Sequence, residues 1–291
     1  MKLHSILATI STLSSLAPPA VVTSFSPISV QVQVQVQVQA LRLNQQQQVQ
    51  HPQRLNAATQ EAATETTTTT SFIATELRGA AMKLHTKSQS PKEGKATETP
   101  KPSEPYVPTH LDYLKFLVDS QYVYKCFEDA ITNNDALHPE LEPLVQTGLE
   151  RYSRLEEDIQ FLSSEYNIDR PDVGEKGLAY GDLITSIAAK GKENIPEFMC
   201  HYYNYYFAHT AGGRMIGKQM AALLLEKKTL EFYKWDGDLN EIKDKVKSSI
   251  EEMAASWSRK QKDQCVGATA AAFMGGGGIN AYLSGGRGGH H

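Results

Sequence analysis

The chain has 291 residues, 40% of them hydrophobic, and a formal net charge of −4 at pH 7. This length suits one ordinary domain with extensions or two small domains. Residues 1–70 hold only one lysine, two arginines and two acidic residues, so the remainder carries 26 basic and 31 acidic residues, a net charge of −5. This balance gives no support to nucleic-acid binding, which depends on a concentrated basic surface.

The extreme N-terminus has the pattern of a signal peptide. Lys2 precedes an apolar segment without acidic residues that is too short, and too interrupted by two adjacent prolines, to span a bilayer. Small side chains precede Phe25, as a cleavage site requires. We therefore expect a signal peptide over residues 1–24.

Residues 25–70 have the composition of a transit peptide. No acidic residue occurs from Phe25 to Gln60, and the segment contains the runs "QVQVQVQVQ", "QQQQ" and "TTTTT". The Val/Gln alternation is formally a strand pattern, but it has no apolar neighbours to pack against, so we expect a disordered, low-complexity segment. The junction "VTSFSP" resembles the bipartite presequences of algae with complex plastids, which implies a location in the plastid (chloroplast stroma).

The alternative is a secreted protein with a flexible pro-region. The three cysteines of this chain, an odd and sparse set, do not suggest the disulfide scaffold of a secreted protein. No other apolar run approaches the length of a membrane span, so we expect none in the mature protein.

Residues 71–274 are predicted to form one all-α domain, because apolar residues recur at helical spacing and strand-like alternation is absent. Thr109 is a candidate N-cap, and a polar, proline-bearing loop is expected over 90–108. The run Gly275–Gly278 predicts a flexible tail over 275–291. The expected helices are 71–89, 110–131, 140–166 in one or two pieces, 178–189, 195–227, 239–261 and a weaker one ending at Phe273.

Two adjacent glycines, Gly212 and Gly213, interrupt the predicted helix 195–227. Each costs about 1 kcal/mol relative to alanine in a helix interior. On a helix they share a face with Tyr205 and His209. Such a face either lets a second helix approach closely or lets the backbone touch a flat ligand.

A second candidate segment is "LRGAAMKLHTK", where His85 follows small residues. Arg78 lies seven residues earlier on the same face, about 10 Å along the axis. An imidazole for iron and a cation for a carboxylate at this separation suit the wall of a haem site. The alternative for either residue alone is an ordinary surface or core side chain.

The chain resembles the plant and algal type of haem oxygenase from about Glu76 to Phe273. The motifs that carry the resemblance occur in the family's order and are "AMKLHT" (81–86), "YLKFLVDSQYVY" (113–124), "TGLERYSRLEEDIQFL" (147–162), "HYYNYYFAHTAGGRMIGK" (201–218) and "LEFYKWDG" (230–237). The resemblance implies an all-α fold that holds haem between a proximal and a distal helix.

The resemblance also implies roles for individual residues. His85 matches the proximal ligand of the haem iron. Gly212 and Gly213 match the distal glycines, whose backbone lies over the haem face. His209 stands where the plant type has histidine and the animal enzymes have aspartate, and would order water above the iron.

Four further positions are implied to contact haem. Arg78 and Lys234 match basic contacts to the propionates, which would set the rotation of the ring through charge-assisted hydrogen bonds. Tyr203 matches a distal tyrosine near the haem edge, and Phe273 stands at the end of the matching region. The glycine run at 275–278 departs from the bulky residues that the family has there.

The implied activity is conversion of haem to biliverdin, with the IX-alpha isomer as the family expectation, carbon monoxide and ferrous iron. Haem is both substrate and oxygen-activating cofactor, and reduced ferredoxin supplies the electrons. A bilin reductase is an expected downstream partner, and a monomer is the expected state. Ferredoxin is acidic, so its docking would need a local basic patch, for which the candidates are Arg214, Lys218, Lys227 and Lys228.

Two alternatives stay open. The first is a haem-binding relative without catalysis, against which His85 argues. The second is an all-α enzyme of similar topology that acts on a thiamin-type molecule with Cys200 as nucleophile. His201 is its nearest base in sequence, but adjacent residues on a helix do not face one another.

Overall fold

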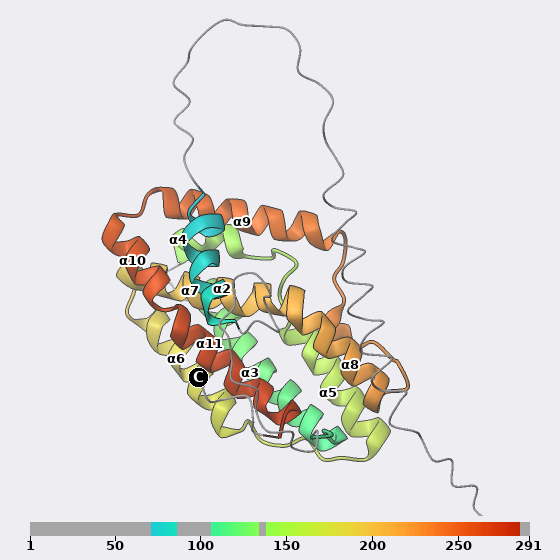
Figure 1. Cartoon of the computed structure of the whole chain (residues 1–291). Helices are drawn as coiled ribbons and strands as arrows, with labels where there is room; N and C mark the ends of the chain where they lie inside the picture. The colour runs from blue at the N-terminus through green and yellow to red at the C-terminus, as the bar shows by residue number, and fades with distance from the viewer. Residues whose placement is uncertain (1–70, 86–105, 134–137, 286–291) are drawn as a thin grey trace, which may run out of the picture. The chain divides into compact units, whose positions relative to one another are not determined.

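The helix α3 (His110–Asn133) is the central element of the structure. The computed structural model describes residues 71–85, 106–133 and 138–285 (Figure 1). α3 packs along α6 (Glu175–Ala189) on one side and α5 (Tyr152–Tyr166) on another. The prediction of Thr109 as its N-cap is confirmed, because the Asp112 N–H donates to Thr109 Oγ1 at 3.2 Å.

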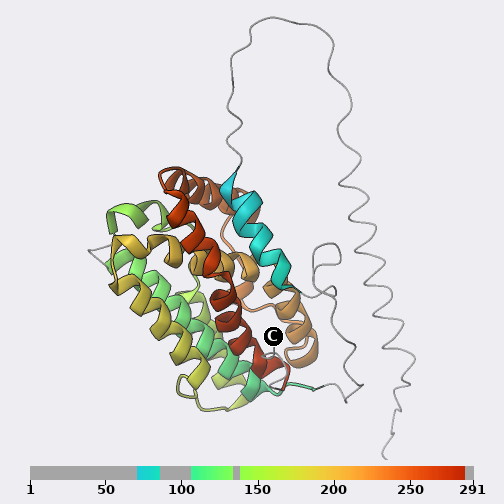
Figure 2. The same cartoon turned by 60° about the vertical axis from the view of Figure 1, so that its left-hand side comes forward.

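The described residues form an all-α domain, as predicted, and contain no β-strand. α2 (Arg78–Leu84) lies beside α11 (Thr269–Asn280) in both views (Figures 1 and 2). α7 (Ile195–Ala208) packs against α10 (Arg259–Gly267) and α11. The remaining elements are α4 (His138–Leu141), α8 (Arg214–Leu224), α9 (Leu239–Ala255), π turns at Ile73–Leu77 and His209–Gly213, and 3₁₀ turns at Glu142–Leu144, Lys192–Asn194, Glu231–Tyr233 and Ala281–Leu283.

Several predicted features lie outside the described residues. These are the signal peptide (1–24), the low-complexity segment (25–70), most of the loop (90–108) and the last six residues of the tail. Of the helices in the described part, none is long and apolar enough to cross a membrane.

The predicted helix 239–261 is wrong as a single element, because α9 ends at Ala255 and α10 begins at Arg259. Ser258 starts the second helix with a capping box. Its Oγ accepts from the Gln261 N–H, while the Gln261 side chain accepts from the Ser258 N–H at 2.9 Å. These reciprocal hydrogen bonds satisfy backbone donors at the start of a new helix. They therefore favour two separate helices over one continuous helix.

The prediction that the last helix ends at Phe273 is also wrong. α11 continues through all four glycines to Asn280, and a 3₁₀ turn follows. The reason is tertiary packing: a Cβ on Gly275 would lie only 2.3 Å from Cδ2 of Tyr180, so the ring of α6 occupies the place of a side chain. Contact with α6, α7 and α2 therefore outweighs the low helix propensity of glycine.

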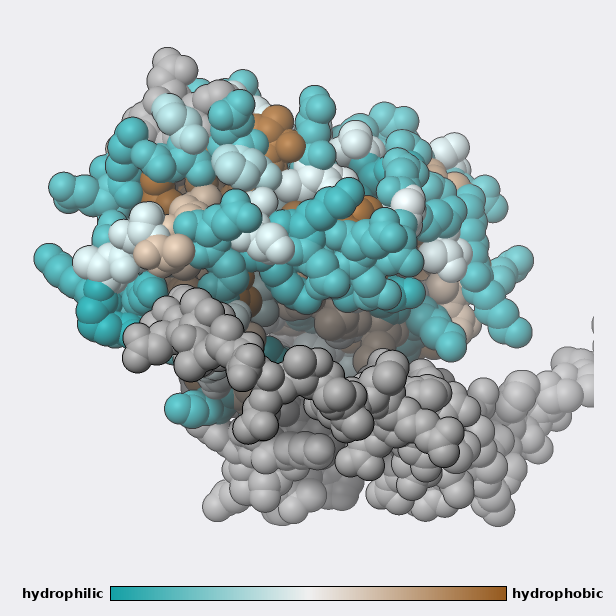
Figure 3. Space-filling model, turned by 90° about the horizontal axis from the view of Figure 1, so that it is seen from above, coloured by the Kyte–Doolittle hydropathy of each residue, from teal (hydrophilic) through white to brown (hydrophobic). Residues whose placement is uncertain are grey.

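The outer surface over α9 is mainly hydrophilic (Figure 3). The helix buries Val246, Ile250 and Ala254, which recur four residues apart on one face. This is the pattern of a helix that covers the core with one stripe and meets water with the rest.

The glycine run yields a matched pair of substitutions. Gly275→Ala should lower the free energy of unfolding by about 1–3 kcal/mol, because the added methyl overlaps the Tyr180 ring. Gly276→Ala should raise it by up to about 1 kcal/mol, because its Cβ would lie 3.7 Å from the Tyr205 ring, an ordinary contact. Urea unfolding of the full chain measures both, and equal effects of the two changes would contradict the packing argument.

Candidate functional site

A cavity of about 280 Å³ lies among α2, α3, α7, the π turn after α7, the 231–233 turn and α11. Its walls are mainly aromatic and aliphatic side chains together with glycine backbone. Among the lining residues are His85, Phe116, Tyr124, Asn204, Tyr205, Ala208, His209, Gly212, Gly213, Phe232, Phe273, Gly276, Gly277, Ile279 and Asn280. It therefore gathers five of the eight residues predicted for the site.

His85 caps the C-terminal end of α2 and lines the cavity. Its Nδ1 lies 2.9 Å from the Ala81 carbonyl oxygen. Because a carbonyl only accepts, Nδ1 carries a proton, so in the neutral form of the ring the lone pair lies on Nε2. Phe273 packs edge-on against the ring, with centroids 5.1 Å apart, and holds its orientation. The result is an oriented imidazole whose Nε2 has no hydrogen-bond partner among the described residues.

The distal segment His209–Gly213 is a π-helical turn between α7 and α8. π turns widen the backbone and occur frequently at functional sites. A Cβ on Gly212 would meet nothing within 4 Å, so this glycine presents open backbone to the cavity. A Cβ on Gly213 would lie 2.9 Å from His209 Nδ1, so this glycine makes room for the histidine.

His209, the first residue of this turn, is buried and is held by the segment that follows α8. Its Nε2 donates to the Phe232 carbonyl oxygen at 2.8 Å, and its ring stacks on Phe232 with centroids 3.9 Å apart. Burial lowers the pKa of His209 to about 3, and the Arg151 and Arg214 charges act in the same direction. The ring is therefore neutral at physiological pH, with its proton on Nε2 and its acceptor nitrogen Nδ1 on the side of Gly213.

Three predicted residues do not line the cavity. Arg78 is exposed on α2. Tyr203 stacks on Phe207 with centroids 4.6 Å apart, and burial raises the pKa of its hydroxyl, while the Arg78 charge lowers it. The Lys234 ammonium donates to the Glu231 carboxylate. Their haem contacts therefore stay predictions.

Several lining residues were not predicted from the sequence. Tyr124, Asn204 and Phe232 all stand inside motifs quoted above, 113–124, 201–218 and 230–237, but were given no role there. Only the folded chain shows that their side chains line one cavity. Gly276 and Asn280 were missed because the helix was expected to end before them.

Cys200, the alternative nucleophile, does not line this cavity. It is fully buried, and its Sγ lies 3.5 Å from Thr269 Oγ1. The neighbouring His201 contacts Tyr180 instead, with Nδ1 3.1 Å from the hydroxyl. The pair therefore does not form a nucleophile and its base.

The buried histidine His201 yields a pH dependence. Burial lowers its pKa to about 4, from a value near 6.5 in the unfolded chain. Between these values the unfolded chain binds a proton that the folded chain does not, so the free energy of unfolding falls as the pH falls. The contribution is present above pH 6.5 and is lost at roughly 1.4 kcal/mol per pH unit below it.

We expect His201→Gln to flatten this fall, because glutamine keeps a polar partner for Tyr180 but does not titrate. Urea unfolding at several pH values between 6.5 and 4.5 compares the two proteins. His209 and Asp158 titrate in both, so only the difference between the slopes reports on His201. Parallel slopes would show that His201 does not carry the effect.

Comparison with known proteins adds an independent line of evidence. A family model described as "Heme oxygenase" matches residues 71–275. "Heme oxygenase 1, chloroplastic" of Oryza sativa subsp. japonica is 39% identical over 198 residues, which cover 68% of this chain and 66% of that protein. The protein of the same name from Arabidopsis thaliana is 38% identical over 200 residues, which cover 68% and 69%. The chain thus spans about two thirds of these relatives.

Other relatives extend the comparison. "Probable inactive heme oxygenase 2, chloroplastic" of Oryza sativa subsp. japonica is 33% identical over 170 residues, covering 58% of this chain and 49% of that protein. The solved structure of heme oxygenase-1 from the cyanobacterium Synechocystis sp. PCC6803 in complex with heme aligns with a TM-score of 0.50 and 21% identity, covering 60% and 77%. At that identity it shows a shared fold alone. Together with the family match over most of the chain, these findings show that the chain belongs to the haem oxygenase family.

Proposed function

We propose that the chain is a plastid haem oxygenase that cleaves haem to biliverdin IX-alpha, carbon monoxide and ferrous iron, with dioxygen and reduced ferredoxin as co-substrates. One observation carries the proposal. The cavity combines an oriented imidazole, whose Nε2 is uncommitted among the described residues, with a glycine whose backbone is open. An iron ligand and a flat, unobstructed wall are what a planar metal-bearing ring requires.

The lining residues fit haem as the substrate. Aromatic and aliphatic side chains offer apolar surface to the ring, and a Cβ on Gly212 would project into space that the ring needs. His85 would bind the iron through Nε2. The Nδ1–H bond to Ala81 fixes the tautomer and raises the basicity of the ligand nitrogen. When bound, haem supplies an iron centre that binds and activates dioxygen.

On the distal side, His209 would orient water and would not act as a strong acid. The pKa of His209 is lowered to about 3, so at physiological pH the ring is neutral and does not act as an imidazolium donor. Its Nε2 proton is committed to the Phe232 carbonyl. The remaining nitrogen, Nδ1, is an acceptor that can orient a water molecule near Gly213.

Arg78 and Lys234 would contact the haem propionates, and Tyr203 would lie near the haem edge. The Lys234 ammonium now pairs with Glu231, and its side chain is 49% exposed. An exposed ion pair of this kind contributes little to stability, so the lysine can exchange one carboxylate for another at low cost. This adaptability supports the proposed propionate contact.

The rival is a haem-binding protein of the same fold without catalysis. Some relatives are named as probable inactive haem oxygenases, which supports this alternative. His85, with its fixed tautomer and its uncommitted Nε2, favours an active enzyme. The plastid location is supported by the chloroplastic names of the relatives. A monomer and a downstream bilin reductase complete the proposal.

The first test follows haem turnover. The full chain is loaded with haem and supplied with reduced ferredoxin in air. The Soret band should decay while a broad red absorption of biliverdin grows, and His85→Ala should abolish or greatly slow this conversion. The product, isolated and chromatographed, identifies the isomer. A stable Soret band in the wild type under efficient electron supply would favour the non-catalytic rival.

A matched pair of glycine substitutions tests where haem binds. Gly212→Leu fills the open wall of the cavity, and Gly267→Leu places the same side chain on α10, where a Cβ also meets nothing within 4 Å. Only the first should weaken haem binding, by roughly tenfold or more. Equal haem affinity of the two variants would place haem elsewhere.

The electron donor is tested by charge reversal. Arg214, Lys218, Lys227 and Lys228 are all exposed, on α8 and the turn that follows it. Replacing them with glutamate should raise the Michaelis constant for ferredoxin several-fold, because an acidic partner would meet like charge. Haem affinity should not change. Unaltered ferredoxin kinetics at low salt would remove this surface from the proposal.

A further inference from the structure

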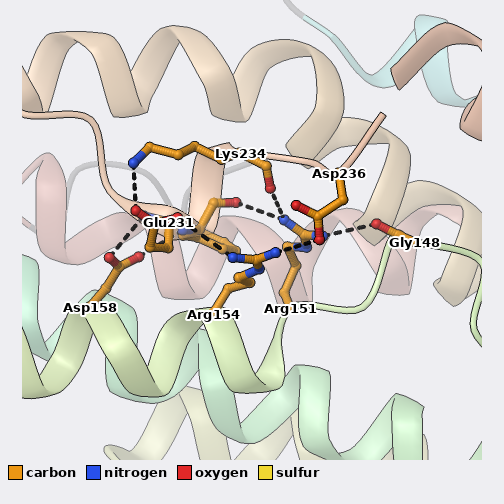
Figure 4. A network of polar contacts seen from close by, with 8 residues as sticks. Gly148, Arg151, Arg154, Asp158, Glu231, Lys234 and Asp236 are labelled. Atoms are coloured by element: carbon orange, nitrogen blue, oxygen red, sulfur yellow. Dashed lines mark hydrogen bonds and ion pairs between the residues drawn. The ribbon is translucent and has the colours of Figure 1, made fainter. Parts of the chain in front are cut away.

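The segment Glu231–Asp236, which holds His209 through the Phe232 carbonyl, is itself held by three residues that precede α5 or lie in its N-terminal half (Figure 4). Arg151 immediately precedes this helix, and Arg154 and Asp158 lie on it. Figure 4 shows their side chains pointing at the segment. Two of the three contact backbone, and the third contacts side chains only, so their roles can be separated.

Asp158 binds the beginning of the 231–233 turn. Its two carboxylate oxygens accept from the Glu231 N–H at 2.8 Å and the Phe232 N–H at 2.7 Å. The side chain is buried, and burial raises its pKa to about 6. A carboxylate at this end satisfies backbone donors that a one-turn 3₁₀ helix leaves free.

Arg151 binds the other end of the same turn. Its Nη1 donates to the Lys234 carbonyl at 2.5 Å and more weakly to the Phe232 carbonyl at 3.5 Å. Its Nη2 donates to the Gly148 carbonyl at 2.9 Å. The guanidinium lies 5.0 Å from the centre of the Trp235 ring. One planar cation thus joins the loop before α5 to the segment after α8.

The charge of Arg151 is unusual because it is buried and its guanidinium forms no ion pair with a carboxylate of the described residues. The residue is 3% exposed. The Glu128 carboxylate accepts from its backbone N–H, and the Glu150 charge acts on the guanidinium without forming an ion pair. Burial lowers its pKa. A buried cation whose partners are mainly backbone carbonyls is costly as a stabilising device, since apolar residues would fill the same volume more favourably. Its geometry, which joins the Phe232 and Lys234 carbonyls to the Gly148 carbonyl before α5, points to a positioning role.

We infer that Asp158 and Arg151 are positioning residues for the distal site: together they fix the Phe232 carbonyl, which keeps His209 in the Nε2–H tautomer with Nδ1 as an acceptor beside Gly213. The alternative is that they only stabilise the fold. For its effect on turnover this inference rests on the proposed haem oxygenase activity, whereas its effect on the tautomer can be measured without turnover.

The chain offers two variants and a matched control. Asp158→Asn keeps the size of the side chain but replaces one of the two acceptor oxygens by a donor. Arg151→Lys keeps the charge but lacks the planar fork that spans two stretches of backbone. Arg154→Lys is the control, because Arg154 bonds the side chains of Asp236 and Glu231 and not the backbone of the segment.

The primary readout is ¹⁵N NMR of the histidine rings in the full chain, with the His209 resonances assigned by their loss in His209→Gln. In the wild type we expect a protonated Nε2 and an unprotonated Nδ1. Asp158→Asn and Arg151→Lys should give a mixture of tautomers, and Arg154→Lys should match the wild type. A wild-type His209 protonated on Nδ1 would overturn the inference without any variant, even if both variants fail to fold.

The second readout separates positioning from binding in haem-loaded protein. Both variants should slow haem conversion by about tenfold or more while haem affinity stays within about threefold of wild type. Folded variants that keep the wild-type tautomer, or that turn over haem as fast as the control, would assign the two residues a structural role only. If the wild type does not convert haem, the proposed function fails, and the tautomer measurement alone decides the inference.

Discussion

The hydrogen bond from His209 Nε2 to the Phe232 carbonyl is the constraint on which the distal half of the site depends. It ties the π turn after α7 to the segment between α8 and α9. It also consumes the donor nitrogen of the ring, so that only an acceptor remains on the side of Gly213. The chemistry available above the cavity is therefore set by a backbone carbonyl and not by an acidic side chain.

His85 follows the same principle with the two ring nitrogens exchanged. Its Nδ1 donates to the Ala81 carbonyl, and its Nε2 has no hydrogen-bond partner among the described residues. Each histidine thus has one nitrogen fixed by the backbone and the other left for chemistry. Because a hydrogen bond to a carbonyl selects a single neutral tautomer, the two rings can take different roles.

The sequence predicted the parts of the site that depend on local pattern. The apolar periodicity of 110–131 matched α3, and the glycine pair Gly212 and Gly213 marked a distorted helix that the structure shows as a π turn. The motifs around His85 and His209 predicted that both residues belong to one site, and both line the same cavity.

What the sequence could not predict depends on contacts between distant segments. The helix through Gly275 and its three following glycines persists because Tyr180 of α6 fills the missing side-chain volume, and no local propensity encodes that contact. The roles of Asp158 and Arg151 were hidden for a similar reason. Their partners in the 231–236 segment are backbone atoms more than 70 residues away, and backbone atoms leave no signature in a sequence.

A crystal structure of the haem-bound chain is the decisive experiment. We expect His85 Nε2 to coordinate the iron and the Gly212 backbone to lie against the other face of the ring. The hydrogen bond from His209 to the Phe232 carbonyl should be retained. Iron coordinated by a different residue, or haem bound outside this cavity, would show that the proposed site is wrong.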